Sequence, residues 1–96
     1  MTQGGIQTRG GGVCEWITLR RIRDQNIVSL GGHYYDQGIL LGAHLAGTVR
    51  DLITEERVRP VQERSYFRLV LTPRGECRLA AMERLTMRRL RLARHG

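Results

Sequence analysis

Arginine side chains are concentrated in a short stretch of the second half of the chain, where they could bind phosphate groups. Residues 48–72 read TVRDLITEERVRPVQERSYFRLVLT, and the arginines in this stretch are Arg50, Arg57, Arg59, Arg64 and Arg68. A guanidinium group can donate two parallel hydrogen bonds to a phosphate or to a guanine edge. The stretch therefore predicts a surface for an anionic partner.

The cysteines and histidines of the chain do not form a pattern that indicates metal binding or catalysis. Cys14 and Cys77 form no CxxC pair, and their spacing to the histidines His33, His44 and His95 is irregular. Two isolated cysteines are typical of free thiols, so we expect neither a metal site nor a cofactor. The sequence also has no glycine-rich phosphate loop after a strand and no apparent Ser-His-Asp or Cys-His arrangement, and we therefore expect that the protein is not an enzyme.

Charge is distributed unevenly along the 96 residues, which are enough for one domain. Residues 1–56 carry 5 arginines and 6 acids, whereas residues 57–96 carry 11 arginines and 3 acids. The absence of lysine indicates a GC-rich genome, such as that of an actinobacterium or its phage. No run of apolar residues is long enough to span a membrane and the start of the chain lacks the features of a signal peptide, so we expect a cytoplasmic protein.

The elements of the first half follow from apolar spacing. Residues 1–12 contain five glycines and predict a flexible tail, with a single domain over 13–96. Apolar residues three and four apart predict a helix from Glu15 to Leu30, ended by Gly31-Gly32. A polar-aromatic connector follows at residues 33–38. Residues 39–56 predict either one helix kinked near Gly47 or a short helix and a longer one.

In the second half, Pro60 restricts residues 57–61 to an edge strand or hairpin. Alternating side chains predict a half-buried strand over Ser65–Leu71, and Thr72-Pro73 is the cap and first position of a helix reaching about residue 93. This helix carries two apolar ridges, more than a core of this size covers. We therefore expect its distal part to form a homodimer interface, with the residues Leu85, Leu90 and Leu92.

The order of these elements resembles the winged helix-turn-helix regulators of the MarR and PadR kinds. The stretch TVRDLITEERVRP is similar to their recognition helix and first wing strand, ERSYFRLVLT to the second wing strand, and LTPRGECRLAAMERL to the junction with the final helix. The resemblance covers residues 48–85. This sequence has Glu55-Glu56-Arg57 at the end of the recognition helix, where these regulators usually have a glycine before the wing. There is also a likeness to small actinobacterial proteins with a YxDxG connector, matched by Tyr34, Tyr35, Asp36 and Gly38.

The resemblance implies an α+β, mostly α, winged-helix-like fold with two to three helices, a short β-hairpin wing and a long C-terminal helix. It implies a transcriptional regulator that binds double-stranded DNA as a homodimer. The expected DNA-binding residues are Thr48, Arg50, Arg57, Arg59, Arg64 and Arg68, with Arg50 able to read guanine and Arg64 at the wing tip. Two alternatives stay open: a protein interaction module on the same scaffold without nucleic acid, and membrane-surface binding by the basic C-terminal helix.

Overall fold

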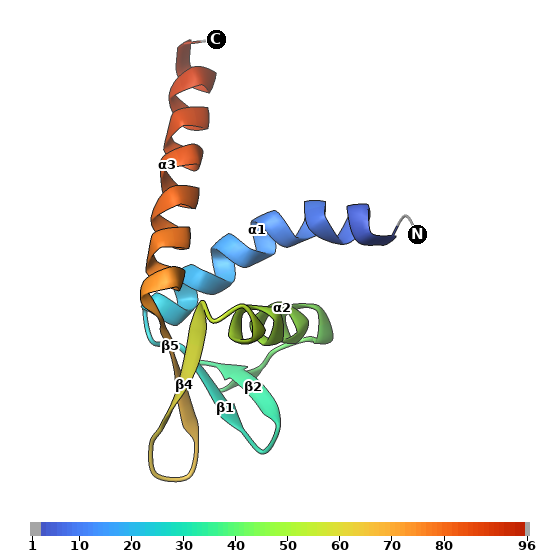
Figure 1. The fold of residues 1–96 in the computed structure, drawn as a ribbon, viewed down its shortest axis with the longest axis vertical. Helices are drawn as coiled ribbons and strands as arrows, with labels where there is room; N and C mark the ends of the chain where they lie inside the picture. Colours follow the sequence, from blue (N-terminus) through green and yellow to red (C-terminus); the bar gives the residue numbers. More distant parts are fainter. Residues whose placement is uncertain (1–2, 96) are drawn as a thin grey trace.

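The computed structural model of the chain describes the backbone of residues 3–95 and the side chains of residues 13–91. The described residues form three helices and a five-stranded antiparallel sheet with strand order β3-β2-β1-β5-β4 (Figure 1). The elements in chain order are α1 (Gln3–Arg23), β1 (Ile27–Leu30), β2 (His33–Asp36), β3 (Ile39–Leu40), α2 (Ala43–Thr54), β4 (Val58–Gln62), β5 (Phe67–Leu71) and α3 (Pro73–His95). The fold class is therefore α+β.

The first helix differs from the prediction at both ends. α1 runs from Gln3 to Arg23, and Ile27–Leu30, which had been expected inside it, is a strand instead. Ile27 fits the helical spacing, but it is buried on a strand that pairs with both β2 and β5. Tertiary pairing has therefore overridden the local pattern. The expected Gly-rich tail, residues 1–12, falls where side chains lie outside the described residues, and its flexibility stays a prediction.

Gly31-Gly32 forms the turn of a β-hairpin and does not end a helix. Leu30 pairs with His33 across it, and the two glycines have φ values of 60° and 84°. Two consecutive positive φ values are the pattern of a type I′ turn, whose twist matches that of the flanking strands. The same device recurs at Gln37-Gly38, with φ values of 52° and 87°, so the polar connector forms β2 and its turn into β3.

Between the two hairpin regions lies one helix. α2 spans Ala43–Thr54 and continues through Gly47 without a break, so neither predicted alternative for residues 39–56 is correct. The segment before it is the short strand β3 and a two-residue link, so the described residues 39–56 contain no second helix. Ala46, Val49 and Leu52 are buried on its inner face.

Glu56 ends α2 in a conformation that favours glycine. Its φ is 62°, its N–H donates to the Ile53 carbonyl at 3.0 Å, and the Arg57 N–H donates to the Leu52 carbonyl at 2.9 Å. This hydrogen-bond pair is a Schellman motif, in which the left-handed residue is usually glycine. Glu56 thus occupies the position of this motif where glycine is usual.

Glu56→Gly is expected to stabilise the protein by about 1 kcal/mol, because the left-handed conformation costs a residue with a Cβ roughly 1–2 kcal/mol. Urea unfolding would measure the difference in free energy. The control Asp51→Gly, at an exposed position inside α2, is expected to lose about 0.5 kcal/mol. Equal destabilisation by both glycines would contradict the prediction.

The β4–β5 hairpin closes the sheet on one side. β4 lies at the edge, as Pro60 requires, and pairs with β5 from Val58↔Leu71 to Gln62↔Phe67. The predicted strand at Ser65–Leu71 is confirmed over Phe67–Leu71. Beyond the last pair the hairpin ends in a loop that extends away from all three helices (Figure 1).

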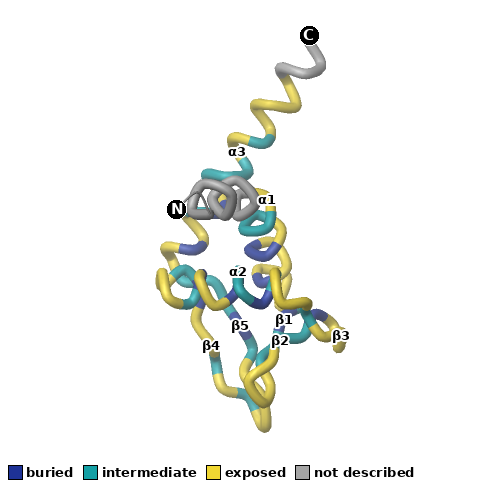
Figure 2. The backbone as a smooth tube through the Cα atoms, turned by 90° about the vertical axis from the view of Figure 1, so that its right-hand side faces the viewer, coloured by how far each residue is buried: buried dark blue, intermediate teal, exposed yellow. Residues whose placement is uncertain are grey.

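The core lies where all three helices meet the sheet. The residues buried there are Leu19, Ile22, Ile27, Val49, Leu52, Val58, Leu69 and Leu79. The first half of α3 packs on this core through Leu79 and Met82, whereas its distal turns project beyond the body and are largely exposed (Figure 2). No helix among the described residues is long and apolar enough to cross a membrane.

Candidate nucleic-acid interface

Two of the expected DNA-binding arginines lie on the β4–β5 hairpin with their charges available. Arg59 lies on β4 and Arg64 in the hairpin loop; both are exposed and form no ion pair with the described residues. The loop is held by the Glu63 N–H, which donates to the Tyr66 carbonyl at 2.9 Å. Arg64 is therefore presented from a fixed turn.

Arg68 is less available. It lies on β5, and its Nε donates to Glu63 Oε2 at 3.0 Å. The two side chains are about one-third exposed, 30% for Arg68 and 33% for Glu63, so the carboxylate cancels much of the charge that a phosphate would meet. An anionic ligand would have to compete with Glu63 for this guanidinium group.

Thr48 and Arg50 lie on α2. The Thr48 hydroxyl donates to the His44 carbonyl at 3.2 Å within the helix. The Arg50 side chain is exposed, and its guanidinium carbon lies 5.9 Å from the centre of the Tyr34 ring. This cation–π contact holds Arg50 over Tyr34 of β2 and uses none of its N–H groups.

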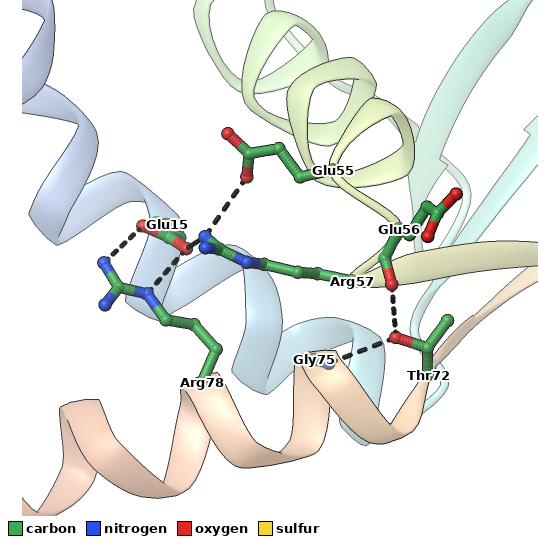
Figure 3. A network of polar contacts seen from close by, with 7 residues as sticks. All are labelled: Glu15, Glu55, Glu56, Arg57, Thr72, Gly75 and Arg78. Atoms are coloured by element: carbon green, nitrogen blue, oxygen red, sulfur yellow. Dashed lines mark hydrogen bonds and ion pairs between the residues drawn. The ribbon is translucent and has the colours of Figure 1, made fainter.

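Arg57 points into the protein. Its Nη1 lies 2.8 Å from Glu15 Oε2 on α1 and 3.1 Å from Glu55 Oε1 (Figure 3). Glu15 also receives hydrogen bonds from Arg78 on α3, at 3.0 Å from Nε and 3.1 Å from Nη2. The Glu15 network, which consists of Glu15, Glu55, Arg57 and Arg78, therefore ties α1, the end of α2 and α3 together.

The pKa of Arg78 and the burial of Glu15 both indicate that the charges of this network are strongly paired. The hydrogen bonds that Arg78 donates to Glu15 raise the pKa of Arg78 above the ordinary arginine value, against the opposing effect of its partial burial. The Glu15 side chain is only 15% exposed, so its charge needs both guanidinium groups. Neither Glu15 nor Arg78 was singled out from the sequence. They are 63 residues apart, and no local pattern indicates that they meet.

A second cluster joins the base of the hairpin to α3. The Thr72 hydroxyl donates to the Glu56 carbonyl at 2.6 Å and accepts the Gly75 N–H at 3.1 Å, while the Thr72 N–H donates to the Arg57 carbonyl at 3.1 Å (Figure 3). The predicted helix cap at Thr72 is thus confirmed. We call this cluster, which consists of Thr72, Gly75, Glu56 and the Arg57 backbone, the hairpin clasp.

A separate ion pair fixes the N-terminal hairpin. Arg21 on α1 lies 2.6 Å from Asp36, whose side chain is 11% exposed at the end of β2. Asp36 belongs to the YxDxG likeness, and the glycine of that pattern is Gly38 in the turn that follows. The pattern therefore has a structural basis: a buried carboxylate paired with α1, next to a tight turn.

The residues expected at a dimer interface lie on the projecting part of α3. Leu85 and Leu90 are 52% and 56% exposed, and the Leu92 side chain lies outside the described residues. Beside Leu85 runs a hollow between α1 and α3 with a volume of about 340 Å³. We call it the α1–α3 groove; it is lined by Val13, Trp16, Arg78, Met82, Leu85, Thr86 and Arg89.

Cys14 and His44 meet between α1 and α2, with Sγ 3.0 Å from Nε2. Cys77 is free and exposed on α3. Among the described residues, no group of three or more His, Cys, Asp or Glu side chains is arranged to hold a metal ion.

Comparisons with protein-family models, with curated proteins and with solved structures found no match for this chain.

Proposed function

We propose that this protein binds double-stranded DNA through the β4–β5 hairpin and the exposed face of α2, and acts as a transcriptional regulator. The observation that carries the proposal is the hairpin itself. It extends away from the three helices and bears Arg59 and Arg64, both exposed and without an ion pair to the described residues (Figure 1). Such arginines bind phosphates or enter a narrow minor groove.

The strand order supports a winged-helix-like scaffold. β1, β5 and β4 lie side by side, α2 directly precedes β4, and α3 directly follows β5. In winged-helix regulators the recognition helix has the position of α2, and the wing has the position of the β4–β5 hairpin. α2 would then face the major groove, with Arg50 as the side chain able to pair bidentately with guanine.

The β2–β3 segment distinguishes this scaffold from a helix-turn-helix. Where the resemblance implies a helix before the recognition helix, this chain has a second hairpin, held to α1 by Arg21 and Asp36. The Glu15 network removes Arg57 from the DNA-binding set, because its guanidinium group is engaged inside the protein. The proposed contacts are therefore Arg50, Arg59 and Arg64, with Thr48 and Arg68 as weaker candidates.

Fluorescence anisotropy with a short mixed-sequence duplex tests the proposal. Affinity is expected to fall steeply between about 50 and 200 mM salt, because each phosphate contact releases counterions. The double variant Arg59→Ala with Arg64→Ala is expected to weaken binding and to lower the log-log salt slope by about 2, since each contact contributes about 0.9.

The matched control is Arg84→Ala with Arg91→Ala, which removes the same charge from exposed positions on α3. It is expected to change the log-log salt slope by less than about 0.5, which is roughly half the contribution of one phosphate contact. Absence of binding at low salt would rule out DNA as the partner. An equal loss in both double variants would rule out the hairpin as its site.

A further inference from the structure

The α1–α3 groove is an open hollow of mixed polarity, in which apolar side chains of both helices lie beside two arginines and a threonine. Met82 and Leu85 line it from α3, and Val13 and Trp16 from α1. Val13 is 63% exposed and Leu85 is 52% exposed. Beyond the groove, α3 continues away from the body, so that one side of it stays free of contacts with the sheet and α2 (Figure 2). Covering the apolar side chains of such a surface with a second apolar surface lowers the free energy of the complex.

Trp16 gives the groove a polar feature. Its indole Nε1 is buried and has no hydrogen-bond partner among the described residues, while the Arg20 guanidinium carbon lies 5.0 Å from the ring centre. A buried N–H without an acceptor is uncommon, and leaving it unpaired costs about 1–3 kcal/mol.

Charge around the groove selects the chemistry of its occupant. After Glu83 the chain contains no acidic residue, whereas α3 carries exposed arginines without ion pairs to the described residues: Arg84, Arg88, Arg89 and Arg91. Arg89 lines the groove itself, and Arg78 lines it with its charge shared with Glu15. An acidic occupant gains from these charges, and a basic one is repelled.

A second copy of the chain is a poor electrostatic match. Its α3 would bring the same arginines into contact with these ones, and residues 1–14 contain no acid that could compensate. We propose instead that the α1–α3 groove docks an acidic amphipathic helix of a partner protein. The apolar face of that helix packs on Val13, Met82 and Leu85, and its carboxylates pair with Arg89, which lines the groove. This surface is separate from the proposed DNA-binding hairpin.

The groove contains its own reporter, because Trp16 is the only tryptophan of the chain. The probe is a synthetic helical peptide with leucines on one face, glutamates elsewhere, and neither tryptophan nor tyrosine. Titration into the full-length chain at about 50 mM salt is expected to change the Trp16 fluorescence saturably, and the affinity should fall as salt rises. Arg89→Glu is expected to weaken binding by about tenfold or more.

Arg91→Glu is the matched control, because it makes the same charge change on the same helix at a position outside the groove. It is expected to weaken binding less than about threefold, since exposed charges are screened by salt. A scrambled peptide of equal composition and a lysine version are expected not to bind. Equal effects of the two arginine variants, or equal binding of the scrambled peptide, would overturn the proposal.

Three other occupants are tested by the same fluorescence signal. A dimer in sedimentation whose formation changes Trp16 fluorescence would assign the groove to a second copy. Anionic vesicles or duplex DNA that displace the acidic peptide would assign it to lipid or to nucleic acid. Each result would overturn the proposal, and none depends on whether the hairpin variants alter DNA binding.

Discussion

Gly75→Ala is expected to destabilise this protein by more than about 3 kcal/mol, because the new methyl group would collide with backbone. A Cβ at Gly75 would lie 1.9 Å from the Arg57 carbonyl oxygen and 2.9 Å from its carbonyl carbon. Overpacking usually costs about 1–3 kcal/mol, and here the atom that must move also accepts the Thr72 N–H. The hairpin clasp would have to open.

Thermal unfolding would measure this effect as a fall in Tm of more than about 10 °C for a domain of this size. The control is Gly47→Ala, whose Cβ would meet nothing within 4 Å on α2. It is expected to stabilise the chain by about 0.5–1 kcal/mol, because alanine favours a helix interior more than glycine does. Gly75→Ala with a Tm near that of the unmodified chain would contradict the predicted close contact.

The second large effect is expected at Glu15. Glu15→Gln leaves Arg57 and Arg78 without their shared carboxylate, and we expect a loss of about 2 kcal/mol in the free energy of unfolding. Breaking a fully buried ion pair costs about 3–5 kcal/mol, and the partial exposure of the two arginine side chains, 26% and 41%, reduces this cost. Urea unfolding at neutral pH, where Arg78 is charged, would measure the difference.

Glu83→Gln is the control, because it removes an exposed ion pair between α1 and α3 with Arg23. Exposed pairs contribute about 0–1 kcal/mol and are screened by salt. The Glu15 effect is therefore expected to persist at high salt while the Glu83 effect disappears. If the two variants lost the same stability, the Glu15 network would be no more than a surface ion pair.

Local patterns predicted the second half of the fold well. Thr72-Pro73 identified the start of α3, and Pro60 identified an edge strand. The two prolines restrict the backbone through their rings, and Thr72 caps the helix that begins beside it, so all three effects are local.

The first half was predicted less well because its structure depends on distant partners. Ile27 has helical spacing, yet it lies on a strand whose neighbour, β5, is some forty positions later in the sequence. Gly31-Gly32 is equally consistent with a helix end and with a hairpin turn, and the β-favouring pair Tyr34-Tyr35 that follows was the available signal for the hairpin. For the site, exposure separated Arg59 and Arg64 from Arg57, and no sequence pattern carries that information.

The sheet is joined between its two halves by few contacts. β1 and β5 pair only through Val28↔Arg68 and Ser29↔Phe67, whereas each hairpin closes between residues that are near neighbours in the chain. Each hairpin can form on its own within microseconds, but the β1–β5 pairing must close a loop of 40 residues. During synthesis the N-terminal hairpins thus leave the ribosome with β1 as an unpaired edge. They complete their sheet only after β5 has emerged.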